Sequence, residues 1–102
     1  MIHVVAEITL KPGCREEFVK LFKAHVLKVR RENGCRAYAP VVDAPGAPMA
    51  GHPPRENVMT VLEQWESLDA LAAHLKATHQ VEFFKKTGAM RAGARVEVMQ
   101  DA

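Results

Sequence analysis

The sequence predicts an α+β fold, because segments with alternating apolar residues are combined with segments of helical periodicity. These segments follow one another in the order strand, helix, strand, strand, helix, strand. This order is typical of a ferredoxin-like βαββαβ sandwich with an antiparallel sheet. The 102 residues suit one domain, which we expect to span residues 1–102.

The first half of the chain contains a strand, a helix and a second strand. Residues 2–10 are expected to form a strand because every even-numbered position is apolar. After a Pro-Gly turn, a helix is expected over residues 15–32, with an apolar stripe of Phe18, Leu21, Phe22, His25 and Val29. An Asn-Gly pair ends this helix. A second strand follows over residues 36–43, and Pro40 within it favours an edge position or a bulge.

The second half contains a long connection, a strand, two helical segments and a last strand. Residues 44–57 hold four of the six prolines and are expected to be irregular. A third strand follows over residues 58–66, and Ser67 is expected to cap a helix over residues 68–77. A shorter helical segment covers residues 79–87, and residues 94–100 alternate as a fourth strand.

The third strand carries apolar residues on both of its rows. Val58 and Leu62 lie on one row, whereas the other row holds Met59, Val61 and Trp65. Helices can cover only one face of such a sheet, so the second row would remain as an exposed apolar patch. We therefore expect a homodimer in which two sheets pack face to face, which is a dimeric α+β barrel.

Composition and charge exclude several classes of protein. The chain is 48% hydrophobic and 25% charged, which is typical of a folded globular protein. A formal net charge of +2 does not indicate a nucleic-acid partner, and no apolar run approaches the roughly 20 residues of a membrane span. The N-terminus lacks the features of a signal peptide, so we expect a cytoplasmic protein. Cys14 and Cys35 would lie about 30 Å apart along the first helix, too far for a disulfide.

The segment over residues 63–79 holds the strongest candidates for chemistry. Glu63 and Trp65 share a row with apolar neighbours, where a carboxylate is either wrapped in hydrogen bonds or raised in pKa by desolvation. His74 and His79 would point about 140° apart on an unbroken helix, so they could not chelate one metal ion, and no metal site is predicted. A helix break near Thr78 could turn His79 back toward the strand.

Other candidates are more ambiguous. His25 interrupts an apolar helix stripe, which favours a core histidine bonded to a carbonyl over a pocket-lining role. Glu7 shares its strand row with His3, and Tyr38 could present its hydroxyl to a ligand. The sequence contains no Gly-rich phosphate loop, nucleophile elbow, or flavin, nicotinamide or haem-attachment motif, so no cofactor is expected.

Three blocks of sequence resemble the antibiotic biosynthesis monooxygenase (ABM) domain family of the dimeric α+β barrel superfamily. They are AEI-x-x-x-PG (6–13), NGC-x-x-YAP-x-VD (33–43) and EQWES-x-x-x-L-x-x-HL-x-x-x-H (63–79). The last two look especially like small bacterial quinol monooxygenases, which act on hydroquinones without metal or flavin. The resemblance implies a cofactor-independent monooxygenase that oxidises a hydroquinone or similar polyphenol with dioxygen. Its site residues would fall on Glu63, Trp65, His74, His79, Glu7 and Tyr38.

Within this resemblance, the residues take hypothetical roles. His74 or His79 would be the catalytic base, and Glu63 would orient that imidazole or accept a proton. Aromatic side chains would wall the substrate ring, namely Trp65, Tyr38 and Phe83 or Phe84, with Glu7 and His25 as further substrate-binding candidates.

Other members of the same fold leave alternatives open. Phosphorylated autoinducer-2 isomerases share the strand Glu and both histidines but usually have Tyr where Trp65 stands, and this chain shows no obvious phosphate cradle. Haem-degrading members use an Asn, Trp and His set that falls here on Ala6, His74 and Phe84, which disfavours that reaction. A ligand-binding or stress protein without turnover is the third alternative.

Overall fold

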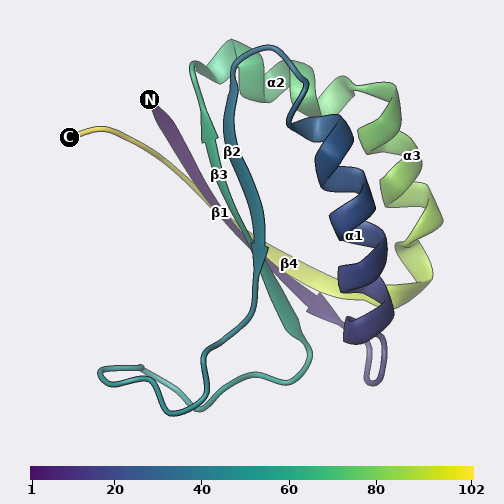
Figure 1. Cartoon of the computed structure of the whole chain (residues 1–102), viewed down its shortest axis with the longest axis vertical. Coiled ribbons are helices and arrows are strands. Elements are labelled where there is room, and N and C mark those ends of the chain that lie inside the picture. Colours follow the sequence, from purple (N-terminus) through teal and green to yellow (C-terminus); the bar gives the residue numbers. More distant parts are fainter.

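The computed structural model describes residues 1–102 and confirms the α+β class (Figure 1). Its elements, in chain order, are β1 (Ile2–Leu10), α1 (Arg15–Val29), β2 (Cys35–Val41), β3 (Val58–Trp65), α2 (Leu68–Lys76), α3 (Thr78–Lys86), a short 3₁₀ helix η1 (Gly88–Met90) and β4 (Arg91–Gln100). The strands form one antiparallel sheet in the order β2-β3-β1-β4. All three α-helices lie on the same face of this sheet, as the ferredoxin-like prediction requires.

The end of α1 differs from the prediction and turns out to matter for the site. The helix ends at Val29 rather than at residue 32, because the next turn tightens. The backbone N–H of Glu32 donates to the carbonyl of Val29, three residues back instead of four. Gly34 then reverses the chain with a φ of +80°, and a Cβ at this position would lie 2.6 Å from the Cβ of Ala70. A glycine is therefore required here both for its backbone angle and for the close approach of α2.

The predicted cap and the predicted break in the second helical region are both confirmed. The Ser67 hydroxyl oxygen accepts a hydrogen bond of 3.1 Å from the backbone N–H of Ala70. Ala77 has an extended conformation, with φ −61° and ψ 137°, which separates α2 from α3. Because the chain changes direction at Ala77, side chains on the two helices do not follow the angular spacing of one continuous helix.

The helix-facing side of the sheet holds the core. The even-numbered row of β1 faces the helices together with the odd-numbered row of β3, and Val4 pairs with Glu63 in that register. β4 presents Val96 and Val98 on the same side, opposite Ala6 and Val4. These two valines remain 56% and 49% exposed, because the helices do not extend over this edge strand. Pro40 lies in β2, the other edge strand, as predicted.

The connection between β2 and β3 has no regular structure, as expected, and it projects away from the helices (Figure 1). Arg55 anchors it by donating to Asp43 at 2.8 Å and to Glu7 of β1 at 3.1 Å. No helix of the protein combines the length and the apolar character that crossing a bilayer demands.

Candidate active site

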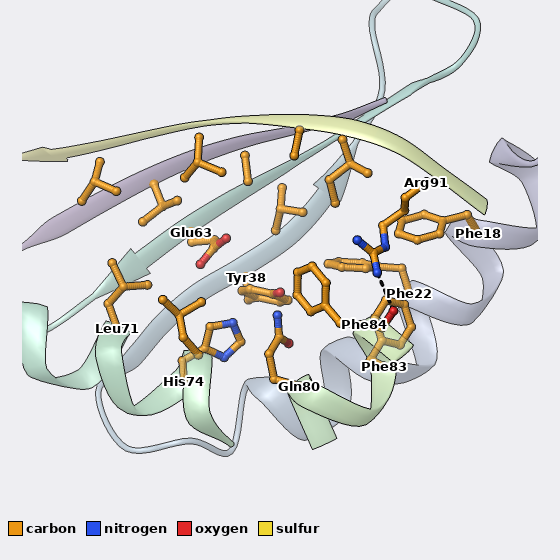
Figure 2. A pocket seen from close by; sticks show the side chains of 18 residues that line it. Phe18, Phe22, Tyr38, Glu63, Leu71, His74, Gln80, Phe83, Phe84 and Arg91 are labelled. Carbon is orange, nitrogen blue, oxygen red and sulfur yellow. Dashed lines mark hydrogen bonds between the residues drawn. The ribbon is translucent and has the colours of Figure 1, made fainter. Parts of the chain in front are cut away.

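A cavity of about 170 Å³ lies between the helices and the sheet (Figure 2). Of the 18 residues that line it, 14 are hydrophobic, and every strand and every α-helix contributes at least one. The charged and amide side chains in its wall are Glu63, His74, Gln80 and Arg91. An apolar cavity with a few converging polar groups is the usual form of a small-molecule site.

His74 is the imidazole that reaches this cavity. It projects from α2, its side chain is only 2% exposed, and its Nδ1 lies 3.0 and 3.1 Å from the two carboxylate oxygens of Glu32. A carboxylate accepts, so Nδ1 carries the proton, and Nε2 has no partner within the protein. Burial lowers the pKa of His74, and the Glu32 carboxylate opposes this shift. A neutral imidazole with a free Nε2 is suited to accept a proton.

Glu63 faces the same cavity from β3. It is buried, and one of its oxygens accepts a hydrogen bond of 2.9 Å from the indole Nε1–H of Trp65. Burial raises the pKa of Glu63, the nearby charge of Glu32 adds to this effect, and the Trp65 hydrogen bond opposes it. The sequence left open whether Glu63 is hydrogen-bonded or raised in pKa by desolvation, and both apply. Trp65 is completely buried and does not line the cavity, so the expectation that it walls a substrate ring is wrong. It instead orients Glu63 through this hydrogen bond.

His79 is brought to Glu32 by the break at Ala77. Its Nε2 lies 2.6 Å from the same Glu32 oxygen that contacts His74, so one carboxylate joins the two histidines. His79 does not line the cavity, however. It lies with His25 in the wall of a second, open hollow of about 220 Å³ between α1 and α3.

His25 is a core histidine, which is the role favoured from the sequence. Its Nε2 lies 2.6 Å from the side-chain oxygen of Gln80, and its ring stacks on Phe83 with centroids 4.3 Å apart. Burial lowers the pKa of His25, and the Gln80 hydrogen bond opposes this. His25 does not reach the main cavity but holds Gln80, which does.

Aromatic rings form much of the cavity wall, as expected. Tyr38, Phe83 and Phe84 all line it, together with Phe18 and Phe22 of α1 (Figure 2). Tyr38 is buried and stacks on Phe22 with centroids 5.5 Å apart. Burial and the charges of two nearby carboxylates raise the pKa of Tyr38 well above its ordinary value, so the hydroxyl is neutral and acts as a hydrogen-bonding group.

Glu7 does not join these residues. It lies on the opposite face of the sheet from Glu63 and is bound to Arg55 at the base of the β2–β3 connection. Its odd-numbered position in β1 explains this placement, because odd and even residues of a strand point to opposite faces. Nowhere in the structure are three His, Cys, Asp or Glu side chains grouped so that they could hold a metal ion.

Sequence reasoning missed Glu32, Gln80 and Arg91. One signal was present for Glu32, since a carboxylate near the C-terminal end of a helix is disfavoured by the helix dipole and needs another reason to be there. Arg91 packs its guanidinium 4.4 Å from the centroid of the Phe84 ring and donates to the Phe84 carbonyl. Neither Gln80 nor Arg91 stands out by spacing or residue type.

Comparisons with known proteins agree with the fold. The family model described as antibiotic biosynthesis monooxygenase matches residues 1–86. A protein named "Probable quinol monooxygenase YgiN" from Escherichia coli K12 is 42% identical over 82 residues, which cover 78% of this chain and 77% of that one. Among solved structures, PA3566 from Pseudomonas aeruginosa has a TM-score of 0.81 at 24% identity, covering 99% of this chain and 93% of that one. Rv0793 from Mycobacterium tuberculosis has a TM-score of 0.80 at 22% identity, covering 99% and 94%. The chain belongs to the antibiotic biosynthesis monooxygenase family.

Proposed function

We propose that this protein is a monooxygenase that oxidises a hydroquinone or a similar polyphenol with dioxygen, without a bound metal or flavin. The observation that supports this most is a buried imidazole at the wall of an aromatic cavity, fixed by a carboxylate through Nδ1 and with Nε2 free. Membership of a monooxygenase family and the name of the Escherichia coli relative support the same reaction class.

The reaction balances without a reductant. One hydroquinone and one dioxygen give one hydroxyquinone and one water, so the substrate itself supplies the electrons. A neutral hydroquinone reacts slowly with dioxygen, whereas its phenolate donates an electron readily. The protein therefore has to remove a phenolic proton inside an apolar space that admits oxygen, and later return a proton to the departing hydroxide.

The geometry favours His74 over His79 as the base. His74 lines the cavity and has Nε2 free, whereas His79 lies behind Glu32 in the second hollow. In this proposal Nε2 of His74 takes the phenolic proton, and the Glu32 carboxylate stabilises the imidazolium that forms. Glu63, held by Trp65, faces the ring from the sheet and accepts or returns a proton of the second hydroxyl.

The cavity limits the size of the substrate. Its volume of about 170 Å³ is close to the roughly 150 Å³ cavity that holds a benzene molecule in an engineered protein. A single aromatic ring fits between Tyr38 and the phenylalanines, and a larger substrate would extend past Val96 and Val98 of β4. We therefore propose a hydroquinone whose reacting ring is buried and whose further groups lie toward β4.

Oxygen consumption tests the proposal directly. We expect the purified protein to consume oxygen with at least one member of a panel of one-ring and two-ring hydroquinones, in buffer treated with chelator. The product should carry one additional oxygen atom, derived from ¹⁸O₂ by mass spectrometry, and none should form without oxygen. Conversion of a phosphorylated dione without oxygen uptake would instead indicate an isomerase. Ligand-induced stabilisation with no substrate consumed would indicate a binding protein.

We also propose that two copies pack through the sheet face opposite the helices. The register places Leu62 beside Val5 and Ala39 on this face, and exposed Val41 and Met99 extend the patch over β2 and β4. A large exposed apolar patch is typical of an interface.

Light scattering at micromolar concentration is expected to give the mass of a dimer. Leu62→Lys, which puts a charge at the centre of the patch, should give a monomer. Leu27→Lys is the matched control, since Leu27 is exposed on α1, on the helical side of the molecule. A monomeric wild-type protein would overturn this interface.

A further inference from the structure

We propose that Glu32 is a positioning residue that holds His74 in its reactive orientation, and that His79 shares this carboxylate and sets how readily His74 takes a proton. The inference rests on the proposed role of His74 as the base. It concerns two residues that do not touch the cavity, and therefore the substrate, themselves.

The contacts of His74, Glu32 and His79 form a short hydrogen-bonded path from the cavity to solvent. Nδ1 of His74 lies 3.0 Å from Oε2 of Glu32, and Nε2 of His79 lies 2.6 Å from the same oxygen. The exposed fraction of the side chain rises along this path, from 2% for His74 to 13% for Glu32 and 26% for His79. The inner histidine therefore meets the substrate, and the outer histidine exchanges protons with water.

The fold builds this arrangement from three separated elements. Glu32 follows the tightened last turn of α1, His74 lies near the end of α2, and His79 lies in the first turn of α3. The two histidines meet one carboxylate only because the chain bends at Ala77. On an unbroken helix their side chains would be about 140° apart. The convergence of the two histidines on Glu32 therefore requires three helices to be placed correctly relative to one another.

The charge balance couples the two histidines. One largely buried carboxylate balances one positive charge, and two imidazoliums on the same oxygen repel each other. A charge on His79 therefore disfavours a second charge on His74, which is one of the effects that lower the pKa of His74. The proton that His74 takes from the phenol is returned to the departing hydroxide, so protons and charge balance over the reaction.

Other ionisable groups lie around this group on all sides. His25, Lys28, Glu82 and Lys86 border the second hollow with His79. On the cavity side, Glu63 and Cys35 feel the charge of Glu32, and burial and Glu32 together raise the pKa of the Cys35 thiol. These groups are the same in all variants below, so differences between variants report on Glu32 and His79.

Two substitutions should shift the reaction in opposite directions. Glu32→Gln removes the negative charge that raises the pKa of His74, so the acidic limb of the kcat/KM–pH profile should move to lower pH. Its kcat should fall at least about tenfold, because the imidazole loses the carboxylate that orients it. His79→Gln keeps a hydrogen-bond donor near Glu32 but removes a positive charge that lowers the pKa of His74, so the limb should move to higher pH. A purely structural role would not produce shifts of opposite sign.

A matched control is available in the same chain. His52 lies 3.8 Å from Asp43 in the β2–β3 connection, so His52→Gln removes a histidine–carboxylate pair away from the cavity. It should leave both kcat and the limb unchanged. Limbs that move in the same direction in Glu32→Gln and His79→Gln, or that do not move, would overturn the proposal.

Ring ¹⁵N NMR of the wild-type protein provides a test that needs neither activity nor a variant. His74 should be the Nδ1–H tautomer, and its titration should proceed in two steps because a second imidazole shares its carboxylate. A single-step titration of His74 would overturn the proposal even if the enzyme is active. A two-step titration in a protein that does not consume oxygen would reject the proposed reaction and leave the shared carboxylate established.

Discussion

Replacing His74 by glutamine is expected to lower kcat for a hydroquinone by about 100- to 10,000-fold, the contribution of a general base. Glutamine is similar in size to histidine, so the packing against Trp65, whose ring centroid lies 4.7 Å away, is largely kept. The loss would therefore report the missing base rather than a collapsed site. Initial rates from an oxygen electrode measure the effect.

The pH dependence gives the same prediction a second readout. His74 acts as a base only when neutral, so kcat/KM of the wild type should fall as pH decreases through the pKa of His74. Because burial lowers this pKa, the limb should lie below the ordinary histidine value of about 6.5. The limb should be absent in His74→Gln and unchanged in His52→Gln, a control in the exposed β2–β3 connection. An identical limb in wild type and His74→Gln would assign the base elsewhere.

Replacing Phe18 by alanine is expected to cost about 3–5 kcal/mol of folding free energy, the usual range for a fully buried phenylalanine. Phe18 is 1% exposed, and its ring centroid lies 6.0 Å from that of Phe22 and 5.8 Å from that of Phe83. Its removal therefore takes away contacts between α1 and α3 as well as apolar area. At roughly 4–8 °C per kcal/mol for a domain of this size, Tm should fall by about 12 °C or more.

Thermal and urea unfolding at one fixed protein concentration measure this change. Leu27→Ala is the matched control, because Leu27 lies on the same helix but is 61% exposed. Its loss should stay within about 0.5 kcal/mol, as for most surface substitutions. A Phe18→Ala protein as stable as Leu27→Ala would mean that the α1–α3 contact is not part of the core.

Sequence patterns were sufficient for most of the fold because the deciding interactions are local. Period-2 alternation located β1 and most of β4, and the Ser67 cap and the break before His79 lie within a few residues of their signals. Strand parity also places Glu7 on the row opposite Ala6 and Ile8. Family resemblance suggested Glu7 for the site, and the backbone geometry of the strand overrides that suggestion.

The contacts that complete the site could not be predicted in this way because they are long-range. Glu32 meets histidines 42 and 47 residues further along the chain, and Gln80 meets His25 across 55 residues. Such contacts depend on how helices pack after the elements have formed, and a helix end displaced by three residues changes where a carboxylate points. Residue type and spacing contain little of that information.

Gly34 shows how such a site can depend on a residue that has no side chain. It lies two residues after Glu32, and the Cβ it lacks would lie 2.6 Å from Ala70, on the helix that carries His74. Any larger residue would push apart the turn that holds the carboxylate and the helix that holds the imidazole. The relative position of the acid–base pair thus depends on the absence of a single methyl group, at a position that takes no part in the chemistry.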